Sequence, residues 1–397
     1  MQEPSHHGKT VQEYRELRLG LSQEELAQRI GKSRRTIVAI EQSAYINSPK
    51  LRRTLAWALQ IPSELLDISN PPSVDIAIFY PLEDIPAPHS ASLKPEIFET
   101  FTENLRMRFD VYYHAGALAA DRNLNAHIER LKQMLPETSS MNRDGLLTLL
   151  SHNYQLKGLI ARDLLDFEVA KRCFREASLW AQQAGCVELH TLTMARLAVV
   201  CIMQKQLDSA NNLYDMAREI SKRSPAALRA YLAVGHAEVQ GKLKDQSCLA
   251  SLTKAHTLLA GIDPKDDPLL LFHSTRCSIQ SINDGWAQCH TFIGKPMLAI
   301  EYYDDLEGKL DLSMTRMRAR IYTQYAEALD VSKELSCCFY AIEGLKLARS
   351  VGSQYNIRRI KQLALKLGSL YPHDGGVKDL LQELHMTVED IQKEFRD

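Results

Sequence analysis

The chain has 397 residues, 45% of them hydrophobic, and a net charge of −1. This composition is typical of a folded protein with two or three structural units. It excludes a polybasic coat on nucleic acid, so any DNA affinity must come from one concentrated patch. No apolar run is long enough to span a bilayer, and the first residues carry no apolar secretion signal. The eight cysteines have neither metal-site nor disulfide spacing, so we expect reduced thiols in a cytoplasmic protein.

The first folded unit is expected at residues 10–68, and its central part reads as two short helices joined by a tight turn. Ser22 can cap the first helix, because Glu25 follows at the reciprocal capping-box spacing. Gly31 suits the end of that helix, where a left-handed residue is needed. Ser33 can cap the second helix. In a helix-turn-helix the first turn of the second helix touches base edges in the major groove, so the candidate DNA-reading residues are Ser33, Arg34, Arg35 and Thr36.

Basic charge is concentrated around this turn. The segment 29–53 holds seven basic residues and one acidic residue, Glu41, which gives it a net charge of +6 in a chain that is almost neutral. A phosphate-binding surface requires such a concentration. The alternative is a solvated basic face on an ordinary small helical domain. The further candidates for phosphate contact are Lys32, Arg52 and Arg53.

These residues closely resemble the Cro/lambda-repressor-like family, also called the xenobiotic-response-element family. The resemblance covers roughly residues 10–68, including Ser48-Pro49 and the closing turn at 62–66. It implies a five-helix domain in which Gln23 lies at a phosphate or a base edge, and in which the exposed turn faces DNA. Ala39 departs from the family pattern, which often has a long polar or basic residue there, so one contact is expected to be missing.

Two segments are expected to lie outside the folded units. Residues 1–9 are polar and are expected to be disordered. Residues 69–92 contain five prolines and are expected to form an extended linker. The apolar run 76–80 inside that linker is expected to dock on one of the two domains.

From residue 93 to residue 397 the chain reads as a succession of helices with an internal repeat. Small residues at fixed offsets let two helices of a hairpin approach closely, and an aromatic residue fills the space between neighbouring hairpins. We therefore predict an all-α protein whose second unit is a tetratricopeptide-like α-solenoid; the alternative is an irregular helical bundle. One copy of the pattern is Gly158, Ala161, Phe167, Ala170, Phe174 and Ala177, and a copy shifted by 40 is Ala198, Cys201, Leu207, Ala210, Tyr214 and Ala217.

Stacked hairpins make a concave groove lined by the first helix of each pair. Amide and guanidinium side chains suit an extended peptide, because they pair with its backbone groups. For each residue alone, the alternative is an ordinary surface position. Ligand binding and dimerisation are both assigned to this domain. The peptide-binding candidates are Gln155, Arg162, Arg196, Gln240, Asn283 and Gln288, with His152 beside them.

The sequence shows no catalytic, cofactor-binding or metal-binding motif. Nothing in it pairs a nucleophile with a base, so an enzyme or an enzyme modulator is the weakest hypothesis.

The order of the units, a Cro-like domain followed by a long repeat domain, resembles the peptide-sensing regulators of the RRNPP type. That resemblance implies a homodimer on an inverted-repeat operator, with a short signal peptide in the groove altering DNA binding. A second hypothesis is a DNA-tethered adaptor whose repeat domain docks a partner protein. A peptide groove should be closed with polar groups converging, whereas a docking surface should be open and apolar.

Overall fold

The computed structural model describes residues 6–18, 21–30, 32–59, 61, 63–66, 95–135, 140–260, 278–310 and 314–386. Every regular element within these ranges is helical. The elements fall into an N-terminal group, up to residue 66, and a repeat domain from residue 95 onward. The expected linker at 69–92, with its apolar run, lies outside the described residues. The prediction of an all-α protein with these two kinds of unit is confirmed.

The N-terminal domain consists of four α-helices, one π-helical segment and one 3-10 turn. They are α1 (His7–Glu13), η1 (Tyr14–Arg18), α2 (Gln23–Arg29), α3 (Arg34–Gln42), α4 (Pro49–Leu59) and η2 (Ser63–Leu66). Side chains from all the α-helices and from η2 share one apolar core, in which Leu26, Ile37 and Leu55 are fully buried. The apolar spacing read from the sequence therefore faces inward, as expected.

Helix α1 begins earlier than the sequence analysis expected, so the prediction of disorder at residues 1–9 is wrong for residues 7–9. His6 caps the helix, since its Nδ1 accepts a hydrogen bond from the backbone N–H of Lys9 at 3.2 Å. His7 is buried, and its Nδ1 accepts from the N–H of Ile46 at 3.2 Å. The polar composition of residues 1–9 gave no sign that His7 packs into the domain, next to Ile46.

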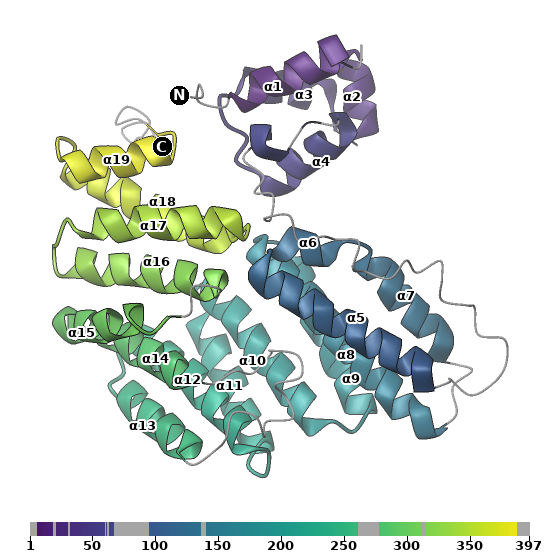
Figure 1. Cartoon of the computed structure of the whole chain (residues 1–397), viewed down its shortest axis with the longest axis vertical. Coiled ribbons are helices and arrows are strands. Elements are labelled where there is room, and N and C mark those ends of the chain that lie inside the picture. Colours follow the sequence, from purple (N-terminus) through teal and green to yellow (C-terminus); the bar gives the residue numbers. More distant parts are fainter. Residues whose placement is uncertain are drawn as a thin grey trace.

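The repeat domain contains six consecutive helical hairpins. They are α8 (Ser140–Asp163) with α9 (Phe167–Gln183), α10 (Val187–Met203) with α11 (Leu207–Ile220), α12 (Ala226–Lys242) with α13 (Ser247–Leu259), α14 (Ile279–Phe292) with α15 (Pro296–Glu307), α16 (Thr315–Val331) with α17 (Cys337–Ser350), and α18 (Gln354–Leu370) with α19 (Gly375–Glu383). Figure 1 shows them following one another along the domain.

The small and aromatic positions of the repeat pattern do what the pattern predicted. Phe174 is buried, and a Cβ added to Gly158 would lie 2.6 Å from its ring, so α8 and α9 depend on the glycine for their close approach. Tyr214 of α11 likewise fills the space that Gly235 leaves open in α12 of the next hairpin. The alanines of both copies are buried. The solenoid reading is thereby favoured over an irregular bundle.

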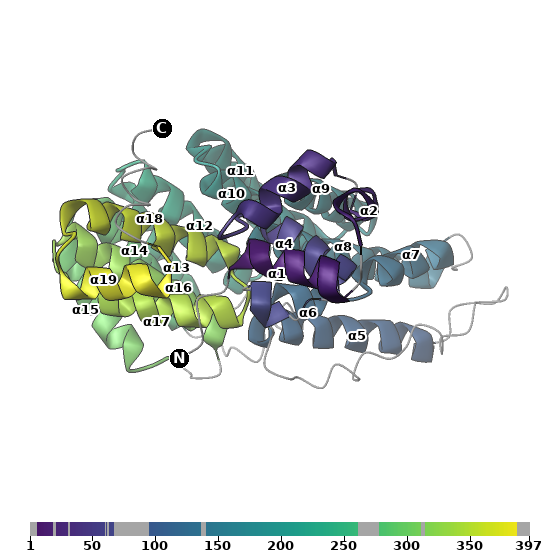
Figure 2. The same cartoon turned by 90° about the horizontal axis from the view of Figure 1, so that it is seen from above.

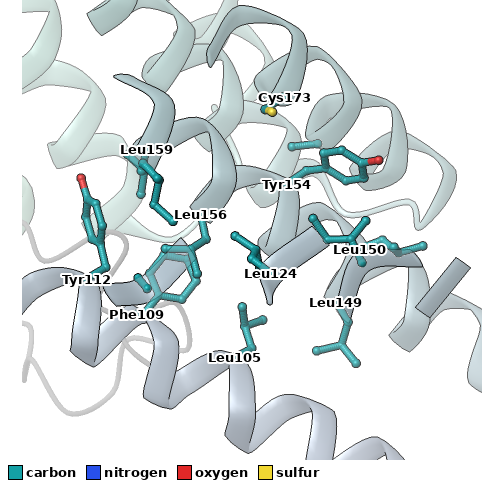
Figure 3. Packing of buried hydrophobic residues seen from close by; sticks show 14 of the residues in the cluster. Leu105, Phe109, Tyr112, Leu124, Leu149, Leu150, Tyr154, Leu156, Leu159 and Cys173 are labelled. Atoms are coloured by element: carbon teal, nitrogen blue, oxygen red, sulfur yellow. The ribbon is translucent and has the colours of Figure 1, made fainter. Parts of the chain in front are cut away.

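Three helices precede the hairpins and carry no copy of the pattern: α5 (Pro95–His114), α6 (Ala117–Asp121) and α7 (Leu124–Met134). They complete the apolar core of the first hairpin. Figure 3 shows Leu105 and Phe109 of α5 directed toward α8, where Leu156 and Leu159 lie in the same cluster. These helices cover the end of the solenoid that would otherwise expose the apolar face of α8.

The hairpins turn through space rather than forming a straight row. Figure 1 shows α5 to α9 at one side of the repeat domain and α13 to α19 at the other, with α10 and α11 between them. Figure 2 likewise has α5 and α7 at one side and α15 to α19 at the other. None of the described helices has the length and apolarity needed to cross a membrane.

Candidate DNA-binding and ligand-binding sites

The two helices of the candidate DNA-binding motif are capped as the sequence predicted. The Ser22 side chain accepts from the N–H of Glu25 at 3.2 Å, and the Glu25 carboxylate accepts from the N–H of Ser22 at 2.7 Å. Ser33 caps α3, because its Oγ accepts from the N–H of Thr36 at 3.2 Å. Both helix starts are therefore fixed by local hydrogen bonds. Gly31, between them, lies outside the described residues.

The first turn of α3 presents basic side chains to solvent. Lys32, Ser33, Arg34 and Arg35 are exposed, while Thr36 is half-buried and its hydroxyl lies 2.9 Å from that of Ser33. Exposed guanidinium groups at a capped helix start have the geometry needed to reach base edges or phosphates. The hydroxyls of this turn serve the cap, so the arginines are its free reading groups.

Glu41 is not part of the surface charge that was counted around this turn. It is buried in α3, where both of its oxygens accept from Arg15 of η1, at 2.5 Å from Nε and 3.1 Å from Nη2. Gln23 of α2 donates to the same carboxylate at 2.8 Å. The hydrogen bond from Arg15 to Glu41 raises the pKa of Arg15, and the Glu41 carboxylate joins η1, α2 and α3. Gln23 was expected to contact DNA, but it is half-buried and its amide is directed at Glu41.

The expectation that Arg52 contacts phosphate is wrong. It is only 3% exposed, its Nη1 donates to the carbonyl of Leu66 at 3.0 Å, and its guanidinium lies 5.1 Å from the ring centroid of Tyr45. It ties η2 to α4 inside the domain and is not placed to contact phosphate. Arg53 lies in α4, but its side chain is outside the described part. Among the described side chains of 29–53, the exposed basic ones are Arg29, Lys32, Arg34 and Arg35.

Three of the six peptide-binding candidates are buried rather than open to a groove. Gln155 and Arg196 are 0% and 2% exposed, and Gln288 is 9% exposed. Gln155 donates to Ser151 Oγ one turn earlier in α8, at 3.4 Å, and Gln288 donates to Asp284 at 3.0 Å. Burial lowers the pKa of Arg196 below its usual value. Because these side chains are buried, the expectation that they line an open groove is wrong.

Arg162 belongs to a charged cluster that the sequence analysis did not find. Its Nη2 donates to the hydroxyl of Tyr112 at 3.2 Å and pairs with Asp163 at 3.1 Å. Asp163 also accepts from Tyr112 at 2.9 Å and from Arg316 of α16. Although burial opposes ionisation, the two arginines hold the pKa of Asp163 below its usual value. The cluster joins α5, α8 and α16.

The remaining two candidates differ in where they point. Gln240 of α12 accepts from Ser251 Oγ of α13 at 2.8 Å, so it faces its own hairpin partner and not the inner side of the solenoid. Asn283 of α14 is half-buried and keeps part of its side chain accessible. Of the amide candidates, Asn283 is the better placed to meet a ligand.

Further ion pairs run between neighbouring first helices. Arg320 of α16 pairs with Asp284 of α14 at 2.8 Å, and Arg359 of α18 donates from Nε to Glu327 of α16 at 2.8 Å. Burial is the main reason that the pKa of Asp284 is raised. Once the helix bounds are known, the repeat register gives the positions at which successive first helices meet. Such ion pairs could be found by looking for opposite charges at those positions.

The structure brings one hydroxyl next to an imidazole, although the sequence pairs no nucleophile with a base. Ser178 Oγ of α9 lies 2.8 Å from Nδ1 of His190 in α10. Gln182 Nε2 lies 3.3 Å from both ring nitrogens of His190, which is not the arrangement of a triad, where a carboxylate contacts the nitrogen opposite the nucleophile. No group of three or more potential metal-ligating side chains occurs within the described ranges.

Residues 11–58 match the family model described as helix-turn-helix. No curated protein matches the chain. Among solved structures, a tetratricopeptide repeat protein from Parabacteroides merdae is 16% identical; the match covers 71% of this chain and 98% of that one, with a TM-score of 0.31. The chain therefore carries a helix-turn-helix in its N-terminal domain, and the six hairpins of its described residues, with their small and aromatic positions, make the second unit tetratricopeptide-like.

Proposed function

We propose that the protein is a sequence-specific DNA-binding transcription regulator whose repeat domain binds a short peptide that changes its DNA affinity. The observation that carries the DNA-binding part is the pair of exposed arginines, Arg34 and Arg35, at the capped start of α3. The buried Arg15–Glu41 pair and the capping box hold the helices that present them. A preorganised basic helix start needs little reordering on binding.

DNA binding is tested by Arg34→Ala and Arg35→Ala. Each change is expected to cost roughly 1–3 kcal/mol of specific binding, because each guanidinium can reach a base edge or a phosphate. The fold should be preserved, since both side chains are exposed. A gel shift with genomic fragments measures the loss. The double variant Arg34→Ala/Arg35→Ala has Arg172→Ala/Arg175→Ala as its matched control, which removes two exposed charges from α9. Equal DNA binding by these two double variants would contradict the assignment of α3.

The DNA-bound form is expected to be a homodimer on an inverted repeat. One domain with a small basic turn offers modest affinity at physiological salt, whereas two half-sites one helical turn apart double the contacts. Light scattering at micromolar concentration should give about twice the 45.0 kDa chain mass. A monomer, both free and on DNA, would contradict this expectation.

Peptide gating is supported by two accessible polar side chains, Asn283 of α14 and Arg320 of α16, and Asn283 offers the sharpest test. By linkage, a ligand shifts DNA affinity only as far as it prefers one conformation, typically by about 1–3 kcal/mol. Asn283→Ala is expected to abolish the response to a binding peptide and to leave peptide-free DNA binding intact. Isothermal titration with candidate peptides, followed by the same gel shift, measures both. Asn212→Ala, an exposed change on α11, is the control; a response equal to that of Asn283→Ala would contradict the site.

A second candidate function, docking of a partner protein, is favoured by exposed apolar side chains at the hairpin tips. Met297, Phe339 and Leu370 are 60%, 61% and 57% exposed, each at the turn of a different C-terminal hairpin. An open apolar surface of this kind suits a protein partner. If no peptide binds, and deletion of residues 93–397 affects DNA binding only through lost dimerisation, the adaptor function replaces the peptide-gated one.

A further inference from the structure

The two ends of the repeat domain meet at a seam that one side chain spans. Arg316, near the start of α16, donates from Nε to the carbonyl of Tyr112 at 3.2 Å and from Nη2 to the carbonyl of Val351 at 3.3 Å. Its Nη1 donates to Asp163, and its guanidinium lies 4.2 Å from the centroid of the Tyr112 ring. Beside it, a Cβ on Gly116 would lie 2.5 Å from the carbonyl oxygen of Val351. α6 and the end of α17 are therefore in backbone contact (Figure 1).

The position of Arg316 is set by the seam and not by its own helix. It is the second residue of α16, where a positive charge opposes the helix dipole. Across the seam it meets the last turn of α5 and the last residue of α8, and on its own side it meets the C-cap of α17. Carbonyl groups at helix ends lack partners within their helices and favour a cation. One guanidinium thus satisfies carbonyls or a carboxylate from three helix ends.

Neither of the two large apolar clusters of the repeat domain contains residues from both sides of this seam, although Ala115, Ala117 and Val351 are buried beside it. The core cluster of the first helices extends from Phe101 in α5 to Val200 in α10, and the core of the last hairpins extends from Ala287 to Leu381. Among the described residues the two clusters share no member. Contacts between units that are polar and small permit relative motion by default, in contrast to units joined through a common core.

We propose that Arg316 is a latch that holds the repeat domain closed, and that the seam between α5–α6 and α16–α18 opens as a unit when the latch is released. The solenoid then exchanges between a closed and an open form without melting its hairpins. Because the hairpins keep their own cores, opening costs only the seam contacts. This latch goes beyond the proposed function, since it operates whether the partner of the domain is a peptide or a protein.

The test uses the full-length protein and Arg316→Ala, with Arg318→Ala as the matched control. Arg318 lies on the same helix, and its guanidinium stacks over Tyr322 of that helix at 5.8 Å. Small-angle X-ray scattering should show a larger radius of gyration for Arg316→Ala only. Hydrogen exchange should be more than tenfold faster in peptides covering 112–121 and 351–356, and unchanged in α10 to α13.

A second variant separates opening from general destabilisation. Gly116→Ala places a methyl group against the Val351 carbonyl and leaves Arg316 in place, so it should open the same seam and speed exchange in the same peptides. Uniformly faster exchange in all hairpins of Arg316→Ala would show a role in the fold as a whole and would overturn the latch. Unchanged scattering and exchange in Arg316→Ala would overturn it too, even if Gly116→Ala opens the seam.

Discussion

Glu41→Ala is expected to destabilise the N-terminal domain by about 3 kcal/mol, because the guanidinium of Arg15 loses its buried carboxylate and keeps only the half-exposed one of Glu16. Both side chains are nearly inaccessible, with 4% of Arg15 and 8% of Glu41 exposed. The change also releases Gln23 from its acceptor. Hydrogen exchange in peptides from α1 to α3 of the full chain measures the loss, which should leave the repeat domain unaffected.

The double variant Arg15→Met with Glu41→Leu shows whether the loss of stability in Glu41→Ala comes from the unpaired charge or from lost packing. Replacing both partners by apolar residues of similar volume removes the uncompensated charge, so its cost should be well below that of Glu41→Ala alone. Glu24→Ala, an exposed change in α2, should be close to neutral. Equal losses in the single and double variants would contradict this expectation, because they would show that the uncompensated charge of Arg15 is not the cause of the loss.

The helix starts of the DNA-binding motif could be predicted because they depend on neighbouring residues. Ser22 and Glu25 form their capping box within a single turn, and the sequence spacing is enough to specify it. The charge count failed where partners lie far apart. Glu41 is neutralised by Arg15, 26 residues away, and Arg52 turns inward because Leu66 and Tyr45 receive it.

The repeat register could be predicted for the same reason. Alanine and aromatic positions such as Phe174 and Tyr214 are buried within or between adjacent hairpins, so each copy carries its own signal. Whether a residue on the inner face is buried or exposed depends instead on how closely successive hairpins stack. Gln155 was expected in a groove and lies fully buried. The Arg316–Asp163 pair, 153 residues apart, has no local signature at all.

Lowering the pH from 7 to 5 is expected to reduce the free energy of unfolding of the repeat domain by roughly 4 kcal/mol, because two buried histidines take up protons only after unfolding. Burial, reinforced by Arg108, lowers the pKa of His127 to about 3, and burial with Arg196 lowers the pKa of His152 to about 3. In the unfolded chain both values return to about 6.5. Between these limits the unfolded state binds more protons, so stability falls as the pH falls.

Each histidine contributes about 1.4 kcal/mol per pH unit below 6.5, which gives about 2 kcal/mol each at pH 5. Ordinary carboxyl groups stay largely ionised at that pH, so the window isolates the histidines. Urea unfolding at pH 7, 6 and 5, followed by far-ultraviolet circular dichroism, measures the slope. His127→Phe with His152→Gln should remove the share of these two histidines, whereas His256→Gln, exposed on α13, should not change the slope. The remainder is expected from His190, His236 and His290, because burial lowers their pKa values too. If the double variant loses stability with pH as steeply as the unsubstituted protein, other groups must control its acid sensitivity.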